Sequence, residues 1–145
     1  MGKNVKVWNL TYIGHDTVIG NNVTIGSLAH IDYDVTIGNN VKIEGLAYLS
    51  PLTKIGNNVF IGPGVIFTND SHPESNKLVG VTVEDEAIIG AGSRLLSGIK
   101  IGKNSVIAMG SVVIKDVPAN TVVAGCPSRI ISDKAEYDKK RIREK

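Results

Sequence analysis

The chain has 145 residues, 16 basic and 14 acidic side chains giving a net charge of +2, and one cysteine. This length suits one domain with one core, and one cysteine excludes both an intrachain disulfide and a cysteine-built zinc site. A nearly neutral chain without a basic stripe is not typical of nucleic-acid-binding proteins. No apolar run reaches the roughly 18 residues of a membrane span, so we expect no membrane partner and a cytoplasmic location.

A six-residue repeat fills most of the chain. Large apolar residues occur at every sixth position from Val7 to Phe67, and again from Val83 to Val113. Six steps of about 100° would scatter these side chains around a helix, whereas an even period keeps them on one side of a strand. Val and Ile number 35 and Leu only 8, and β-branched residues favour strands. The repeat therefore predicts a series of short strands.

A longer period groups these strands. The sequence Ile-Gly-Asn-Asn-Val occurs at 19–23, 37–41 and 55–59, at a spacing of 18. Three hexads thus make one unit, which we interpret as one coil of a three-sided parallel β-helix with neighbouring coils about 4.8 Å apart. We predict an all-β, single-domain β-helix of about six triangular coils over residues 1–132.

One segment interrupts the repeat. Phe67 and Val83 are 16 positions apart, which is not a multiple of six, so residues 69–82 must leave the wall and return. Loops held on rigid scaffolds frequently carry function. Further on, Asp133 followed by Glu136 predicts a capping box that opens a short charged helix over 133–145.

These features together resemble the left-handed β-helix, hexapeptide-repeat acyltransferases. Residues 62–70, followed by Pro73, are similar to the loop of nucleotide-sugar N-acetyltransferases that acetylate a 3-amino group, and residues 110–118 and 124–131 are similar to the acetyl-CoA end of the superfamily. The left hand of the coil is implied by this resemblance alone. The resemblance implies transfer of an acetyl group from acetyl-CoA to a nucleotide-linked amino sugar, without a metal, in a homotrimer whose active sites lie between chains.

The loop supplies the candidate catalytic residues. His72 has a reference pKa of about 6.5, which suits a base that takes the proton of the acceptor amine or hydroxyl. Asn69 is a neutral donor and acceptor suited to holding the acceptor, and Asp70 either orients His72, binds the sugar or caps a turn. Glu74 stands where the 3-amino-sugar enzymes usually have Arg, and it would repel a substrate carboxylate.

The cofactor residues follow from the resemblance. It implies that the backbone N–H of Ala91 faces the thioester oxygen and that the pantetheine arm passes Ala91, Met109, Gly110 and Ile114. Lys115 and Arg129 would then face the phosphates of CoA.

Three other functions remain open. His72-Pro73 also resembles the His-Pro of galactoside and maltose O-acetyltransferases, which predicts O-acetylation of a sugar hydroxyl. A γ-type carbonic anhydrase needs three histidines converging on zinc, but His15, His30 and His72 do not share a position or face in the 18-residue frame. A purely structural β-helix is the third alternative.

Overall fold

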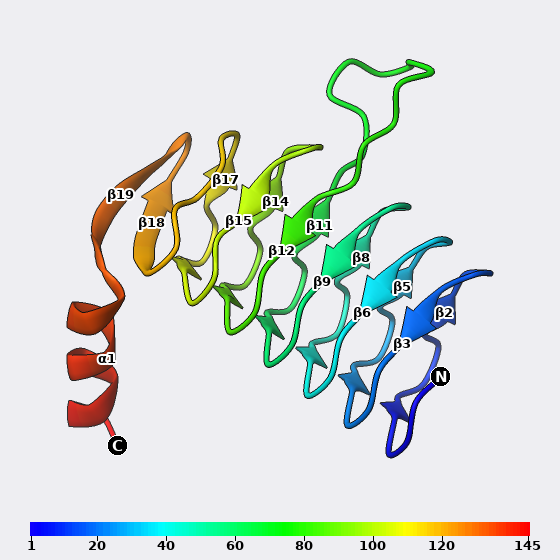
Figure 1. Ribbon diagram of the computed structural model, residues 1–145, viewed down its shortest axis with the longest axis horizontal. Coiled ribbons are helices and arrows are strands. Elements are labelled where there is room, and N and C mark those ends of the chain that lie inside the picture. The colour runs from blue at the N-terminus through cyan, green and yellow to red at the C-terminus, as the bar shows by residue number, and fades with distance from the viewer.

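The computed structural model, which describes residues 1–145, is a parallel β-solenoid of about seven turns with one helix at its C-terminal end (Figure 1). Three sheets form the three sides of the prism, and each turn adds one strand to each sheet. Sheet A contains β1 (Lys6–Val7), β4 (Thr24–Ile25), β7 (Lys42–Ile43), β10 (Phe60–Ile61), β13 (Ile88–Ile89), β16 (Val106–Ile107), β18 (Thr121–Gly125) and β19 (Ser128–Asp133). Sheet B contains β2 (Tyr12–Ile13), β5 (His30–Ile31), β8 (Tyr48–Leu49), β11 (Ile66–Phe67), β14 (Arg94–Leu95) and β17 (Val112–Val113). Sheet C contains β3 (Val18–Ile19), β6 (Thr36–Ile37), β9 (Lys54–Ile55), β12 (Thr82–Val83) and β15 (Lys100–Ile101).

The six-residue repeat sets the direction of every side chain in these strands. The second residue of each two-residue strand points into the prism, where Ile25, Leu49 and Ile89 are fully buried in one core of 27 residues. The first residue points outward. The first coil is less covered because nothing stacks below it, so Val7 stays 41% exposed. The prediction of short strands with a shared inward face is confirmed.

Tight corners of four residues join the sheets, and we name each by the sheets it connects. At the C–A corner, backbone N–H groups are bonded by side chains of the next coil: Asn21 N donates to Asn39 Oδ1, and Asn39 N donates to Asn57 Oδ1, both at 2.8 Å. The following residue of this corner adopts a left-handed φ, 57° at Asn22 and 56° at Asn40, which asparagine tolerates better than most residues. The repeated Ile-Gly-Asn-Asn-Val sequence is therefore the signature of this corner.

The predicted excursion leaves the wall at the B–C corner and keeps the register. Lys42 pairs with Phe60, 18 positions on, but Phe60 pairs with Ile88, 28 positions on, so ten residues are inserted. The segment between β11 and β12 projects well beyond the other corners (Figure 1). The coils on both sides of it continue as one prism.

The last coil ends differently from the sequence prediction. Val117 pairs with Ile101, and Val122 with Val106, at a spacing of 16, because the last B–C corner is two residues shorter. Because of this shortening, the last inward residues do not fall on the six-residue spacing. The solenoid therefore has about one more turn than the repeat predicts. Residues 128–132, predicted as part of the β-helix, instead form most of β19, which runs antiparallel to β18.

The predicted C-terminal helix is confirmed as α1 (Lys134–Arg143). Its N-cap is Asp133, whose Oδ1 accepts a hydrogen bond from the Glu136 backbone N at 2.8 Å. The helix lies beside the wall, since Tyr137 and Arg141 share a groove with residues of sheet A. At ten residues, it falls short of the length and apolarity that a membrane crossing needs.

Candidate active site

The excursion loop is held together by the carboxylate of Asp70. This side chain accepts hydrogen bonds from the backbone N of His72 at 3.0 Å, from Ser75 N at 2.8 Å and from Ser75 Oγ at 2.9 Å. The Ser75 backbone N–H is the main cause that lowers the pKa of Asp70. Of the roles predicted for Asp70, the structure shows the turn-forming one, because its carboxylate binds the His72 backbone rather than the ring.

The other two predicted catalytic side chains are free. His72 is exposed, and its Nδ1 lies 3.2 Å from Ser71 Oγ, which leaves Nε2 unpartnered. The Asn69 carbonyl accepts from Val79 N at 2.9 Å and closes the neck of the loop, while its side-chain amide makes no protein hydrogen bond. The loop thus presents an imidazole at its exposed part and an amide at its base.

Three predicted cofactor residues meet at the A–B corner. Ala91 and Met109 occupy the same corner position in successive coils, and Gly110 N donates to the Ala91 carbonyl at 2.8 Å. The N–H groups of Ala91 and Met109 have no acceptor in the protein. This contrasts with the C–A corner, where side-chain oxygens bond the corresponding amides, as at Asn21. The A–B corner therefore has unbonded amides that a ligand could use.

The same corner changes from leucine to glycine along the solenoid. One corner position has φ between 61° and 70° in all six coils: Leu10, Leu28, Leu46, Gly64, Gly92 and Gly110. A Cβ atom added at any of these three glycines would meet nothing within 4 Å. Since leucine adopts this backbone in the first three coils, conformation alone does not require glycine in the last three. The visible effect of glycine is a bare edge beside Ala91.

The remaining cofactor predictions fall at two places. Arg129 lies on β19 and pairs with Ala124 of β18. The residue before Ala124, Val123, pairs with Ile107, which directly precedes the A–B corner that contains Met109. Arg129 therefore extends this edge of the prism beyond Met109. Ile114 and Lys115 lie instead at the B–C corner, across sheet B. The structure therefore brings Ala91, Met109, Gly110 and Arg129 onto one edge of the prism and places Ile114 and Lys115 at another.

Sequence reasoning missed Arg94. It occupies the outward position of β14, and its Nη1 donates to the Gly92 carbonyl at 2.6 Å and to the Gly64 carbonyl at 3.3 Å. With Thr68 and Ile114 it borders a shallow groove of about 130 Å³ on the outer face of sheet B. The available signal was a single arginine at an outward position of the hexad frame, next to the segment predicted to bind the cofactor.

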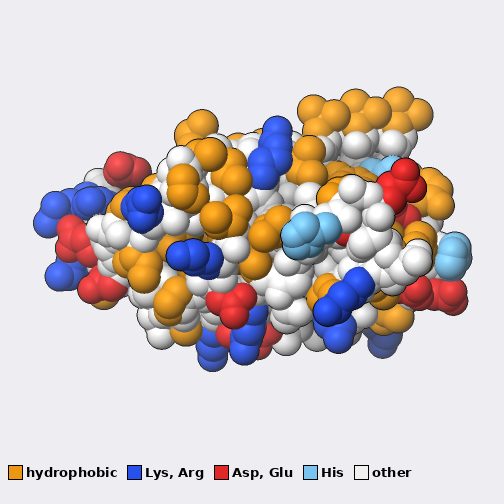
Figure 2. All heavy atoms as spheres, turned by 90° about the horizontal axis from the view of Figure 1, so that it is seen from above, with side chains coloured by type: hydrophobic (Ala, Val, Ile, Leu, Met, Phe, Trp, Pro, Cys, Tyr) orange, Lys and Arg blue, Asp and Glu red, His pale blue; other side chains and the backbone are white.

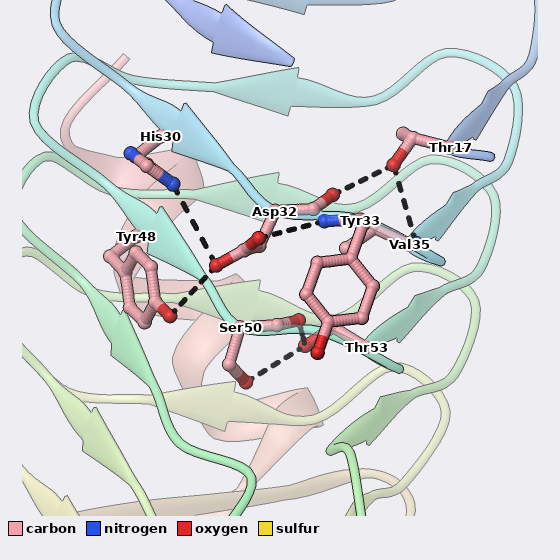
Figure 3. A network of polar contacts seen from close by, with 8 residues as sticks. All are labelled: Thr17, His30, Asp32, Tyr33, Val35, Tyr48, Ser50 and Thr53. Atoms are coloured by element: carbon pink, nitrogen blue, oxygen red, sulfur yellow. Dashed lines mark hydrogen bonds and ion pairs between the residues drawn. The ribbon is translucent and has the colours of Figure 1, made fainter. Parts of the chain in front are cut away.

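A second polar cluster lies on the same side, nearer the N-terminus (Figure 3). Asp32 accepts a hydrogen bond from Tyr48 Oη at 3.1 Å and lies 3.7 Å from His30 Nε2. Tyr12 stacks on His30 with ring centroids 4.6 Å apart, and His15 stacks on Tyr33. No group of three or more metal-ligating side chains forms here or elsewhere.

Known proteins support the family resemblance. A family model described as "Bacterial transferase hexapeptide (six repeats)" matches residues 1–33, 34–69 and 80–115. A 2,3,4,5-tetrahydropyridine-2,6-dicarboxylate N-acetyltransferase of Clostridium perfringens is 44% identical over 79 residues, which are 54% of this chain and 33% of that protein. The chain thus spans about a third of the length of this protein and of a Staphylococcus aureus relative of the same name.

Two solved structures share the fold. The N-acyltransferase AntD from Bacillus cereus, in complex with dTDP-4-amino-4,6-dideoxyglucose and coenzyme A, has a TM-score of 0.82 at 21% identity, covering 99% of this chain and 90% of that one. A hexapeptide-repeat acetyltransferase from Vibrio cholerae has a TM-score of 0.58 at 28% identity, covering 92% and 73%. With its repeat, its prism and the matching family model, the chain belongs to the bacterial hexapeptide-repeat transferase family.

Proposed function

We propose that this protein transfers the acetyl group of acetyl-CoA to the amino group of a nucleotide-linked amino sugar. The observation that carries the proposal is the unbonded N–H of Ala91, which lies on an edge stripped of side chains at Gly92 and Gly110. Such an amide can bond the thioester oxygen as negative charge develops on it. The relatives named as N-acetyltransferases support acetyl transfer to an amine, and the solved AntD complex with CoA and a nucleotide-linked amino sugar supports the class of acceptor.

In this proposal the cofactor follows the A–B corner. The pantetheine arm would pass Gly110 and the exposed Met109, and the phosphates would reach Arg129, which extends the same edge. A guanidinium group suits phosphate because its N–H donors can bond two oxygens at once. Ile114 and Lys115 would reach the same cofactor only from across sheet B.

The acceptor would bind at the loop. Its uncharged amine attacks the carbonyl carbon of the thioester, so that a C–N bond forms, the C–S bond breaks and the sulfur leaves with the electron pair. His72 Nε2 accepts the proton released by the amine and returns it to the thiolate, while the free amide of Asn69 orients the acceptor. Because an amine is a better nucleophile than a hydroxyl, we expect His72 to contribute less than it would in O-acetylation.

We further propose a homotrimer in which each site forms between two chains. Leu10, Leu28 and Leu46 are 83%, 52% and 64% exposed. Figure 2 shows hydrophobic side chains projecting in a row along one edge of the solenoid. A stacked row of exposed leucines is unusual on a free surface, and a neighbouring chain would cover it. The projecting loop of one chain would then reach the A–B corner of the next.

The test is acetyl-CoA-dependent thiol release, measured with no added metal against a panel of acceptors. The panel contains nucleotide-linked amino sugars, neutral sugars and the dicarboxylate named for the Clostridium perfringens relative. We expect release with a nucleotide-linked amino sugar, and a rate loss of about 10²-fold in His72→Ala and about 10-fold in Asn69→Ala. His15→Ala is the matched control, because His15 is also exposed but lies away from the loop. Release with the dicarboxylate alone would contradict the sugar assignment.

One alternative keeps a specific observation in its favour. The exposed imidazole of His72, whose Nε2 has no partner, also suits a base for a sugar hydroxyl, as in O-acetyltransfer. In that case thiol release would require a hydroxyl acceptor, and His72→Ala would abolish it. The same acceptor panel separates the two reactions.

A further inference from the structure

We propose that Arg94 binds an anionic oxygen group of the acceptor, a carboxylate or a phosphate, and so selects an acidic acceptor. This inference rests on the proposed function and names a further residue of the same site. Arg94 stands between the Ala91 amide and the neck of the excursion loop, on the face of the prism where donor and acceptor would meet.

The guanidinium group of Arg94 is fixed in place by the wall. Its Nη1 donates to the carbonyls of Gly92 and Gly64, which are 28 residues apart in sequence but occupy the same A–B corner position in successive coils. These bonds use one of the three nitrogens, so Nε and Nη2 keep their N–H donors free. A free pair of parallel donors on an anchored guanidinium is the geometry that binds a carboxylate or phosphate through two oxygens.

The charge of Arg94 is not balanced by the protein. No carboxylate lies within 4.0 Å of it, whereas two other outward-facing cations of the wall are paired: Lys42 with Glu44 at 3.0 Å and Lys100 with Glu84 at 2.8 Å. The charge of Arg94 is therefore not screened by a partner of this kind. An unpaired arginine beside a groove instead attracts an anionic ligand.

The surroundings of Arg94 favour the acceptor over the cofactor as this ligand. The groove next to it runs across the outer face of sheet B to Thr68, where the loop begins, and its floor is formed by Leu96, Val112 and Ile114. The cofactor edge lies in the other direction, along Met109 towards Arg129. An acceptor held at the A–B corner beside Ala91, with the loop of the neighbouring chain over it, would therefore lie next to this apolar floor and place an anionic group against Arg94.

The decisive experiment compares acceptors in wild type and Arg94→Gln. The set contains a nucleotide-linked amino sugar with a C6 carboxylate, the same compound with a C6 hydroxymethyl group, and each sugar without its nucleotide. We expect Arg94→Gln to raise KM about 10- to 100-fold for acceptors that carry the bound anion, with an unchanged Kd for acetyl-CoA. A rise in KM confined to the sugars with a C6 carboxylate would show that Arg94 binds the carboxylate. An equal rise in KM for both nucleotide-linked compounds, with no rise for the sugars without a nucleotide, would show that Arg94 binds the phosphate.

Two further variants separate charge from fold. Arg94→Lys keeps the charge but loses the paired donors, so we expect it to recover only part of the affinity. Lys54→Gln removes an outward cation from sheet C and is expected to leave every KM unchanged. Calorimetric binding of the acceptors to wild type and Arg94→Gln gives a readout without turnover. Thiol release from no acceptor would overturn the proposed function, whereas an active Arg94→Gln with unchanged acceptor KM, or one that weakens acetyl-CoA instead, would overturn this inference.

Discussion

The hydroxyl group of Tyr48 donates a hydrogen bond to Asp32 of the coil below, with 3.1 Å between the two oxygens (Figure 3). Burial, followed by the negative charge of Asp32, raises the pKa of Tyr48 to about 12 from a usual 10.0. Because the raised pKa belongs to the folded state, the stability from neutral Tyr48 is complete below pH 10 and is lost as the pH rises towards 12.

Phenolate absorbance should therefore show a late step that belongs to Tyr48. We expect the Tyr48 phenolate to form about two pH units above the usual pKa of 10.0. Asp32→Asn should move this late step to lower pH without removing it, since burial is the larger cause. Tyr48→Phe should remove the late step, and its persistence in that variant would contradict the assignment.

The bare edge at Gly92 gives a second prediction. Gly92→Leu should keep the fold, because Leu28 adopts the same left-handed backbone, at a cost of about 1 kcal/mol in the free energy of unfolding. The new side chain would occupy the proposed pantetheine track, so the Kd for acetyl-CoA should rise at least about 10-fold. The measurement is calorimetric binding.

Glu86→Leu is the matched control for Gly92→Leu. Glu86 has a φ of 65° at the C–A corner, so this variant adds the same side chain to the same backbone conformation on another edge. Its acetyl-CoA affinity should equal that of the wild type. Equal losses in both variants would show that the effect is conformational and not a blocked track.

Asp70 should act on the order of the loop and not on the stability of the prism. Asp70→Ala removes three hydrogen bonds, so the amides of His72 and Ser75 should exchange with deuterium faster while the midpoint of thermal unfolding stays nearly constant. Because the pKa of Asp70 is lowered, loop order should persist above its usual pKa and be lost as the pH falls through the lowered one. Glu74→Ala, also in the loop, should leave both exchange rates unchanged.

The asparagine row at the C–A corner should contribute measurable stability. Asn39→Ala removes the acceptor of the Asn21 N–H and should lower the free energy of unfolding by about 0.5–1.5 kcal/mol in urea titration. Lys3 N–H is bonded in the same way by Asn21, at the less covered first coil. Asn21→Ala should therefore cost less than Asn39→Ala, and the reverse order would count against this explanation.

The hexad period was sufficient to predict the prism, since one inward residue per strand, such as Ile25 or Ile89, fixes both strand length and register. The excursion followed from one broken spacing. The last coil could not be predicted because its corner is two residues shorter. Val117 and Val123 still point inward, but they no longer fall on the six-residue spacing. Pairing of β19 with β18 depends on a chain reversal that no periodicity encodes.

The candidate site was less accessible to sequence reasoning. His72 could be located because the loop contains a single histidine. The role of Ala91 depends on a backbone N–H. That of Arg94 depends on the carbonyl of Gly92 in its own coil and that of Gly64 in the coil below, and neither role depends on a pattern in residue types. Such contacts become visible only when the coils are stacked.

The ten-residue insertion separates the loop from the scaffold that carries it. Asn69 and Gly80 flank the insertion, and the neck is already closed by the bond between Val79 N and the Asn69 carbonyl. Excising residues 70–79 would leave a four-residue corner in which Gly80 takes the place that Leu52 holds, at a φ of 70°, one coil below. The loop is thus structurally separable from the prism, and a loop of another length could be grafted between the same two coils without disturbing those above or below.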